Sequence, residues 1–170
     1  MAQQKTRINI PKEYGPLERE AIAERVIDRI IKRTQDGKDV NGDKFAKYSK
    51  AYKQSLEFKI AGKTNKVNLT LTESMLNSIE KLADRSGSIT VGIPADDTEN
   101  NGKAEGNQKG TYGKKRQIAP KRQFLGISDK ELNSILKEFP LKDRESALEK
   151  AAKLVASRRA ARETAEEVID

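Results

Sequence analysis

Apolar residues recur at intervals of three and four along the first part of the chain. From Pro16 to about residue 35 they alternate with charged residues and fall on one helical face, comprising Ile22, Val26, Ile27, Ile30 and Ile31. Proline is favoured at the first position of a helix, and Gly37 suits the position just after its last turn. The pattern predicts one amphipathic helix that buries this face.

The spacing changes to the alternation of β-strands between residues 79 and 93. Ser86 and Gly87 supply a turn, and a strand-like run from Ser88 ends before Pro94. A β-hairpin is expected here. A further strand is expected over 117–125, at an edge of the sheet because Pro120 has no N–H to donate.

Two shorter helices are expected between these segments. Residues 49–60 carry Tyr52, Leu56 and Ile60 at intervals of four, which predicts a single helix. A second short helix is expected over 73–78, with Thr72 as its N-cap.

The last part of the chain is predicted to be helical. Ser128 and Glu131 have the spacing of a capping box, and Pro140 ends the helix that they begin. A long helix follows over about 142–168, with an apolar stripe that fades after Ser157. The end of this helix is therefore expected to project or to depend on a partner.

These elements predict an α+β fold, in which a small and mainly antiparallel sheet is packed by the N-terminal amphipathic helix and shorter helices. We expect an N-terminal arm over 1–16, an α+β domain over 17–140 and a C-terminal helical extension over 141–170. Two interpretations of the arm remain open: Ile8, Ile10 and the proline that follows form an edge strand, or they dock on a neighbouring protein. The arm, a polar loop over 95–116 and the C-terminal helix are predicted to become ordered on contact with a partner.

The composition removes several kinds of chemistry. The chain has no cysteine and no histidine, which excludes thiolate metal sites and every Ser-His or Cys-His pair. The acids of 36–43 do not form an EF-hand, because the twelfth position counted from Asp36 is Lys47. The Gly-Lys-Thr at 62–64 lacks the earlier glycine of a phosphate-binding loop. We therefore expect no enzyme activity, cofactor or metal site, and no membrane span, because no apolar run is long enough.

Basic residues exceed acidic ones by 34 to 26, and the excess is concentrated between residues 103 and 122. The candidate partner or DNA contacts in this basic loop are Lys103, Lys109, Lys114, Lys115, Arg116, Lys121 and Arg122. Three interpretations remain open: contact with DNA phosphates, docking on an acidic neighbouring protein, or a solvated loop.

Four aromatic residues also have two interpretations. Phe45, Tyr48, Tyr52 and Phe124 are expected in the core, with a partner surface as the alternative.

Three segments resemble a known family. Residues 37–52 (GKDVNGDKFAKYSKAY) are similar to the G-x-D-x-x-G-x-x-F-x-x-Y-S-x-x-Y segment of the phage virion morphogenesis, or tail completion, family. Residues 69–78 (LTLTESMLNS) resemble its L-x-L-T-G-x-M-L-x-S, and 122–131 (RQFLGISDKE) its R-x-F-L-G-(L/I)-S-D-x-D/E. Their order and rough spacing also match, over about residues 17–140.

The resemblance implies a structural virion protein in the neck of a tailed bacteriophage. Such a subunit forms a ring with copies of itself, usually a hexamer, that completes the tail and joins it to the head. The implied partners are the head connector or stopper, the tail tube or terminator proteins, and the DNA in the channel. The protein would be made in the host cytoplasm and reside in the virion. Two alternatives remain: a sequence-independent DNA-binding protein, and a tail-terminator or tube subunit.

Overall fold

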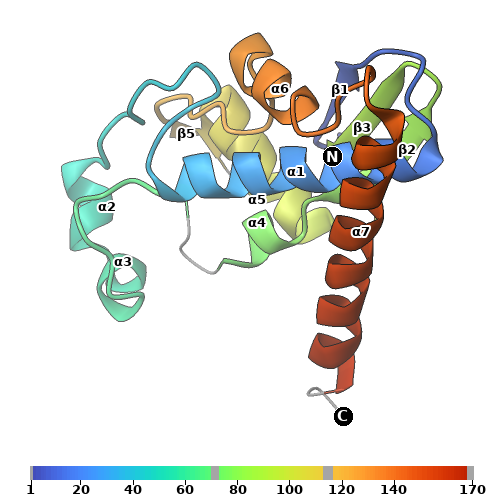
Figure 1. Cartoon of the computed structure of the whole chain (residues 1–170). Coiled ribbons are helices and arrows are strands. Elements are labelled where there is room, and N and C mark those ends of the chain that lie inside the picture. Colours follow the sequence, from blue (N-terminus) through green and yellow to red (C-terminus); the bar gives the residue numbers. More distant parts are fainter. Residues whose placement is uncertain (1, 70–72, 113–116, 168–170) are drawn as a thin grey trace.

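The structure, a computed structural model, describes residues 2–69, 73–112 and 117–167. It has the expected α+β arrangement, in which one long helix runs beside a small antiparallel sheet (Figure 1). The sheet has the strand order β1-β3-β2 and consists of β1 (Lys5–Asn9), β2 (Glu80–Arg85) and β3 (Ser88–Gly92).

The predicted amphipathic helix is confirmed as α1 (Pro16–Gln35). Its fully buried residues include Ile22, Val26 and Ile30, the face that the sequence pattern selects. Glu18 accepts a hydrogen bond from the N–H of Gly15 at 2.7 Å, which satisfies a free donor at the start of the helix. The helix contacts β2, β3 and two later helices, so it is the common support of the fold.

The predicted hairpin is confirmed as β2 and β3, joined by a turn at Ser86 and Gly87. Gly87 has a φ of 84°, a conformation that favours glycine at such a turn. A bulge between Lys81 and Ala83 shifts the register of β2 by one residue.

Of the two interpretations of the arm, the edge strand is confirmed, because β1 pairs with β3 at the edge of the sheet and Ile8 is buried. This strand is ordered within the chain itself and not only on contact with a partner. One expectation about the sheet is wrong. The strand expected over 117–125 does not join this sheet. Only β5 (Gln117–Ile118) is a strand, and it pairs with β4 (Thr111–Tyr112) in a separate ribbon. The N–H groups of Phe124 and Leu125 donate instead to Oε1 of Gln108, so they are not free to continue a ladder.

The loop expected over 95–116 is also wrong in its central part, where α5 (Thr98–Lys109) forms. Asp97 caps its N-terminus through the N–H of Asn100, and Gly110 ends it with a φ of 71°. Buried asparagines support the helix: Nδ2 of Asn101 donates to the carbonyls of Pro94 and Asp97. The helix is thus stabilised by polar bonds, not by an apolar stripe.

The single helix expected over 49–60 is two short helices, α2 (Lys50–Gln54) and α3 (Leu56–Ile60). Ser55 has an extended backbone between them and caps α3 through the N–H of Phe58. The hydroxyl competes for the N–H that would continue one helix. In the next segment α4 (Ser74–Asn77) is helical as expected, whereas Thr72 lies outside the described residues.

Both C-terminal helices are confirmed. Ser128 and Glu131 form the predicted capping box of α6 (Asp129–Leu136). The long helix is α7 (Arg144–Glu167), which packs across α1 through Ala147, Ala151 and Val155. Beyond this contact the described side chains of α7 are exposed apart from Arg158, and the helix extends past the body (Figure 1).

Candidate partner-binding surface

The first and third sequence motifs meet at Arg122. Its Nε and Nη2 donate to the carbonyl of Ala46 at 3.3 and 3.2 Å, and Nη2 also lies 3.4 Å from the carbonyl of Lys47. Its guanidinium carbon lies 5.3 Å from the centre of the Tyr48 ring. Only 6% of Arg122 is exposed. This residue is therefore internal, and its prediction as a partner or DNA contact is wrong.

Arg33 fixes the same third motif from α1. Its guanidinium donates to Oε2 of Glu131 at 2.6 Å and to the carbonyls of Phe124 and Gly126 at 2.7 and 2.9 Å. Burial lowers the pKa of Arg33, and the Glu131 carboxylate opposes that shift. The first motif joins this arrangement where the N–H of Val40 donates to the carbonyl of Gln123. The motif residues thus build a hydrogen-bonded junction near the end of α1.

The second motif contributes core packing. Met75 and Leu76 are buried, and α4 lies against α5. Residues 70–72 of this motif lie outside the described residues.

An aromatic cluster lies next to the junction. The rings of Tyr48, Tyr52 and Phe58 have centroids 5.1 to 5.7 Å apart. The Nζ of Lys63 donates to the Tyr48 hydroxyl at 3.2 Å and to Oδ1 of Asn68 at 2.9 Å. Burial, and then the charge of Arg122, lower the pKa of this lysine. Burial also raises the pKa of Tyr48.

The four predicted core aromatics have different positions. Phe45 and Phe124 lie in the main core as expected. Tyr48 only borders that core, and Tyr52 is half-buried in the aromatic cluster.

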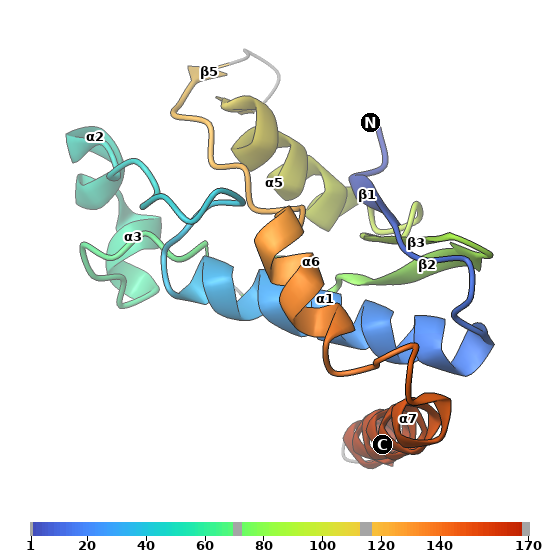
Figure 2. The same cartoon turned by 45° about the horizontal axis from the view of Figure 1, so that its top comes forward.

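This cluster joins the two helices of residues 46–66, which we name the α2–α3 appendage. The appendage lies apart from the rest of the fold (Figures 1 and 2). It contains six lysines and one glutamate. Its helix α3 exposes two large apolar side chains, Leu56 at 71% and Ile60 at 76%. Among the described residues no carboxylate lies within ion-pair distance of these lysines, although Lys63 is bound as above. Two exposed apolar side chains on a segment rich in lysines are typical of an interaction surface.

The basic loop expected over 103–122 is less basic than its sequence. Lys103 pairs with Glu99 and Lys109 with Glu105, each at 2.6 Å along α5. Lys121 is exposed, and no carboxylate pairs with it in the described part of the chain. Lys114, Lys115 and Arg116 lie outside the described residues. Contact of Lys103, Lys109 and Lys121 with a partner or DNA stays a prediction. Among the described residues, the appendage holds more lysines without a carboxylate partner than this loop does.

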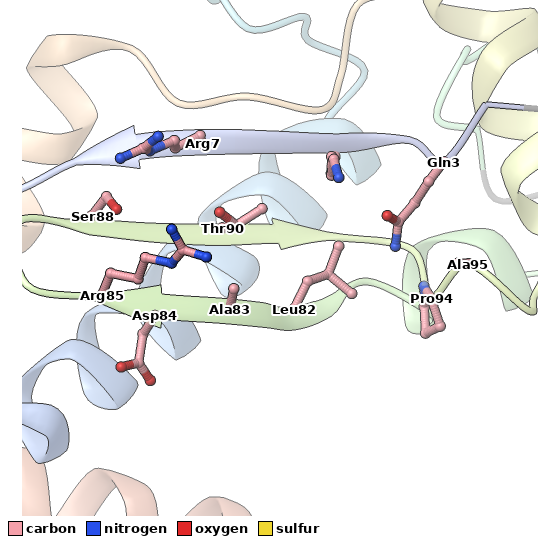
Figure 3. Close-up of a pocket in the computed structure, with 11 residues that line it drawn as sticks. Gln3, Arg7, Leu82, Ala83, Asp84, Arg85, Ser88, Thr90, Pro94 and Ala95 are labelled. Atoms are coloured by element: carbon pink, nitrogen blue, oxygen red, sulfur yellow. The ribbon is translucent and has the colours of Figure 1, made fainter.

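A hollow of about 560 Å³ covers the sheet face opposite α1 (Figure 3). Gln3, Arg7, Arg85 and Thr90 line it, and Arg85 extends over the strands toward Thr90. The carboxylate of Asp84 points away from it and bonds to Arg19 and Lys81. The hollow is thus a polar and open face of the sheet.

Two further observations concern the described residues alone. Across 2–69, 73–112 and 117–167, no group of three or more acidic side chains is placed to hold a metal ion. In the same part of the chain, no helix combines the length and the apolar character that crossing a membrane requires.

No protein-family model matches the chain, and no curated protein or solved structure is significantly similar to it. The likeness of the three motifs to the tail completion family therefore remains a hypothesis from the sequence.

Proposed function

We propose that this protein is a structural subunit of a tailed-bacteriophage virion. Copies of it form a ring in the neck, around the DNA channel, which completes the tail and joins it to the head connector. The observation that carries the proposal is the α2–α3 appendage, an exposed apolar and basic surface whose base is bound by Arg122. A subunit whose role is assembly needs such a surface, because its contacts supply the binding free energy.

The anchoring also gives the sequence motifs a physical role. Arg122 and Tyr48 come from two different motifs and contact each other directly. The residues that carry the resemblance to the tail completion family are therefore ones that position the candidate interface. This supports an assembly role, because a structural subunit depends on the placement of its contact surfaces.

Sequence-independent DNA binding is the second candidate, and the unpaired lysines of the appendage favour it. Lysine side chains neutralise phosphates and release counterions, so this activity would weaken steeply with added salt. Leu56 and Ile60 at the centre of the same surface weigh against it, since phosphates do not cover apolar side chains.

Removal of the gene from the phage that encodes it tests the proposed function. Electron micrographs of the lysate should show filled heads and complete tails that are not joined. Restoration of the gene on a plasmid should restore joined particles. Absence of tails would indicate a tube subunit, tails of irregular length would indicate a terminator, and normal virions would contradict a neck function.

A further inference from the structure

Three large hydrophobic side chains are exposed in the described part of the chain: Leu56, Ile60 and Leu148. The first two lie on α3 and the third lies on α7, where it is 40% exposed. Helix α3 lies beyond the C-terminal end of α1, whereas α7 crosses α1 nearer its N-terminal end (Figures 1 and 2). A helix of this length spans about 30 Å, so the two sites do not meet within one copy.

The surface around Leu148 has the opposite charge to the appendage. Helical spacing places Leu148 in one stripe with exposed alanines and glutamates, which we name the α7 stripe: Glu145, Leu148, Glu149, Ala152, Ala156, Glu163 and Glu166. Glu149 pairs with Lys153, whereas Glu145, Glu163 and Glu166 pair with no lysine or arginine among the described residues.

The arginines of α7 do not cancel this charge, because they are committed to α1. Arg158 pairs with Asp28, Arg162 with Glu24 at 2.6 Å, and Arg159 lies 3.5 Å from Glu20. Arg159 lies on the same helical face as the stripe and is largely exposed, but it reaches Glu20 of α1. The stripe therefore keeps more glutamates than basic residues, together with its small and apolar residues.

The appendage presents the complementary surface. Leu56 and Ile60 are four residues apart and lie on one side of α3. Lys53 precedes them, and Lys59 lies between them together with Glu57. Neither lysine has a carboxylate partner in the described part of the protein. A pair of long apolar side chains on an appendage with six lysines and one glutamate fits a surface of alanines and one leucine bordered by glutamates.

We infer that the α2–α3 appendage of one copy docks on the α7 stripe of the next copy. Leu56 and Ile60 pack on Leu148, Ala152 and Ala156, and the lysines of the appendage face the glutamates of the stripe. Because each copy uses two different surfaces, the contact is head-to-tail, and a suitable rotation between copies closes it into a ring. This inference rests on the proposed ring and identifies the interface that would build it.

Two variants test the docking, each altering one surface. The appendage variant carries Leu56→Gln and Ile60→Gln, which remove the apolar contact without adding charge. The stripe variant carries Leu148→Lys and Ala152→Lys, which place positive charge opposite the lysines. A control with Asn133→Lys and Ser134→Lys adds the same charge on exposed positions of α6. Circular dichroism and thermal unfolding establish that all three fold like the natural chain.

Sedimentation velocity over a series of concentrations gives the outcome. The natural chain and the control should form the same large species, whereas each variant alone should remain a monomer. An equal mixture of the two variants should give a one-to-one dimer and nothing larger, because only one intact pair of surfaces remains. No symmetric pairing of like surfaces gives this result.

Several outcomes would overturn the docking. If either variant assembles like the natural chain, the surface that it alters is not part of the interface. A natural chain that stays monomeric would exclude the contact altogether. Loss of duplex binding in the appendage variant with unchanged assembly would assign that surface to DNA. The phage deletion is independent of these results, so a neck defect together with a failed docking test would leave the proposed function standing and reject this interface alone.

Discussion

Arg122 lies over the ring of Tyr48, with its guanidinium carbon 5.3 Å from the ring centre and its N–H groups bonded to the two carbonyls just before that ring. The arginine therefore contacts both the side chain and the backbone at the base of the α2–α3 appendage. The position of the appendage relative to the body depends on this contact.

Replacement of Arg122 by alanine should free the appendage. The loss of charge-assisted bonds to carbonyls is expected to cost about 2 kcal/mol of unfolding free energy. Amides of residues 46–66 should exchange with deuterium faster than those of α1. Arg122→Lys should recover little, because an ammonium cannot reproduce the planar fork. Lys121→Ala, at an exposed neighbour, is the control, and equal stability of Arg122→Ala and Lys121→Ala would contradict this role.

Glu131→Gln should destabilise the junction strongly. It leaves the buried guanidinium of Arg33 without its negative partner, at a cost of about 3 kcal/mol. Asp129→Asn removes the same charge from an exposed position of α6 and should cost much less. Urea unfolding of both variants measures the difference. A loss for Glu131→Gln no greater than for Asp129→Asn would show that the ion pair does not hold the junction.

Asn101→Ala should loosen α5 and the N-terminal strand together. Its Oδ1 accepts from the N–H of Gln4 at 2.7 Å, and its Nδ2 donates to Pro94 and Asp97. The unsatisfied groups should cost about 2 kcal/mol, and β1 should lose protection against exchange. The exposed Asn133→Ala serves as the comparison. Unchanged protection of the β1 amides would show that Asn101 does not couple the stability of β1 to that of α5.

Stability should fall in acid partly through Asp84. The hydrogen bond from Lys81 first, and the contacts with Arg19, lower the pKa of Asp84 below its ordinary 3.8. A carboxyl group with a lowered folded-state pKa stabilises the protein above the unfolded value, and this contribution disappears as the pH falls through the folded value. For this partly exposed pair we expect at most about 1 kcal/mol.

Unfolding of Asp84→Asn across the acid range tests this effect. The variant should be less stable than the natural chain at neutral pH and equally stable in strong acid. A constant difference at every pH would mean that packing, and not ionisation, accounts for the loss.

The sequence predicted those elements whose apolar pattern or capping is local. Helix α1 shows its buried face directly in the spacing of Ile22, Val26 and Ile30, and α6 shows its capping box. Helix α5 has no such stripe, because its support comes from asparagines that bond to distant backbone groups. The N-terminal strand was only one of two interpretations of Ile8 and Ile10, because its partner β3 lies far away in the chain and no local pattern identifies it.

The candidate site was predicted only in part. The sequence shows an excess of basic residues over 103–122 but not that a helix forms there. That helix pairs Lys103 with Glu99 and Lys109 with Glu105, which reduces the free positive charge. Arg122 gave no local sign that it would be buried. The appendage was missed because its lysines are spread over two helices, and the exposure of Leu56 and Ile60 appears only once Ser55 interrupts the expected helix.

The most direct test of the proposed assembly is light scattering of the purified chain after size exclusion, at low and high salt, with negative-stain images of the peak. We expect a closed ring of fixed mass with a central hole, whose association weakens as salt screens the lysines of the appendage from the glutamates of α7. A monomer at every concentration that binds free duplex DNA tightly at low salt would contradict it and favour the DNA-binding alternative.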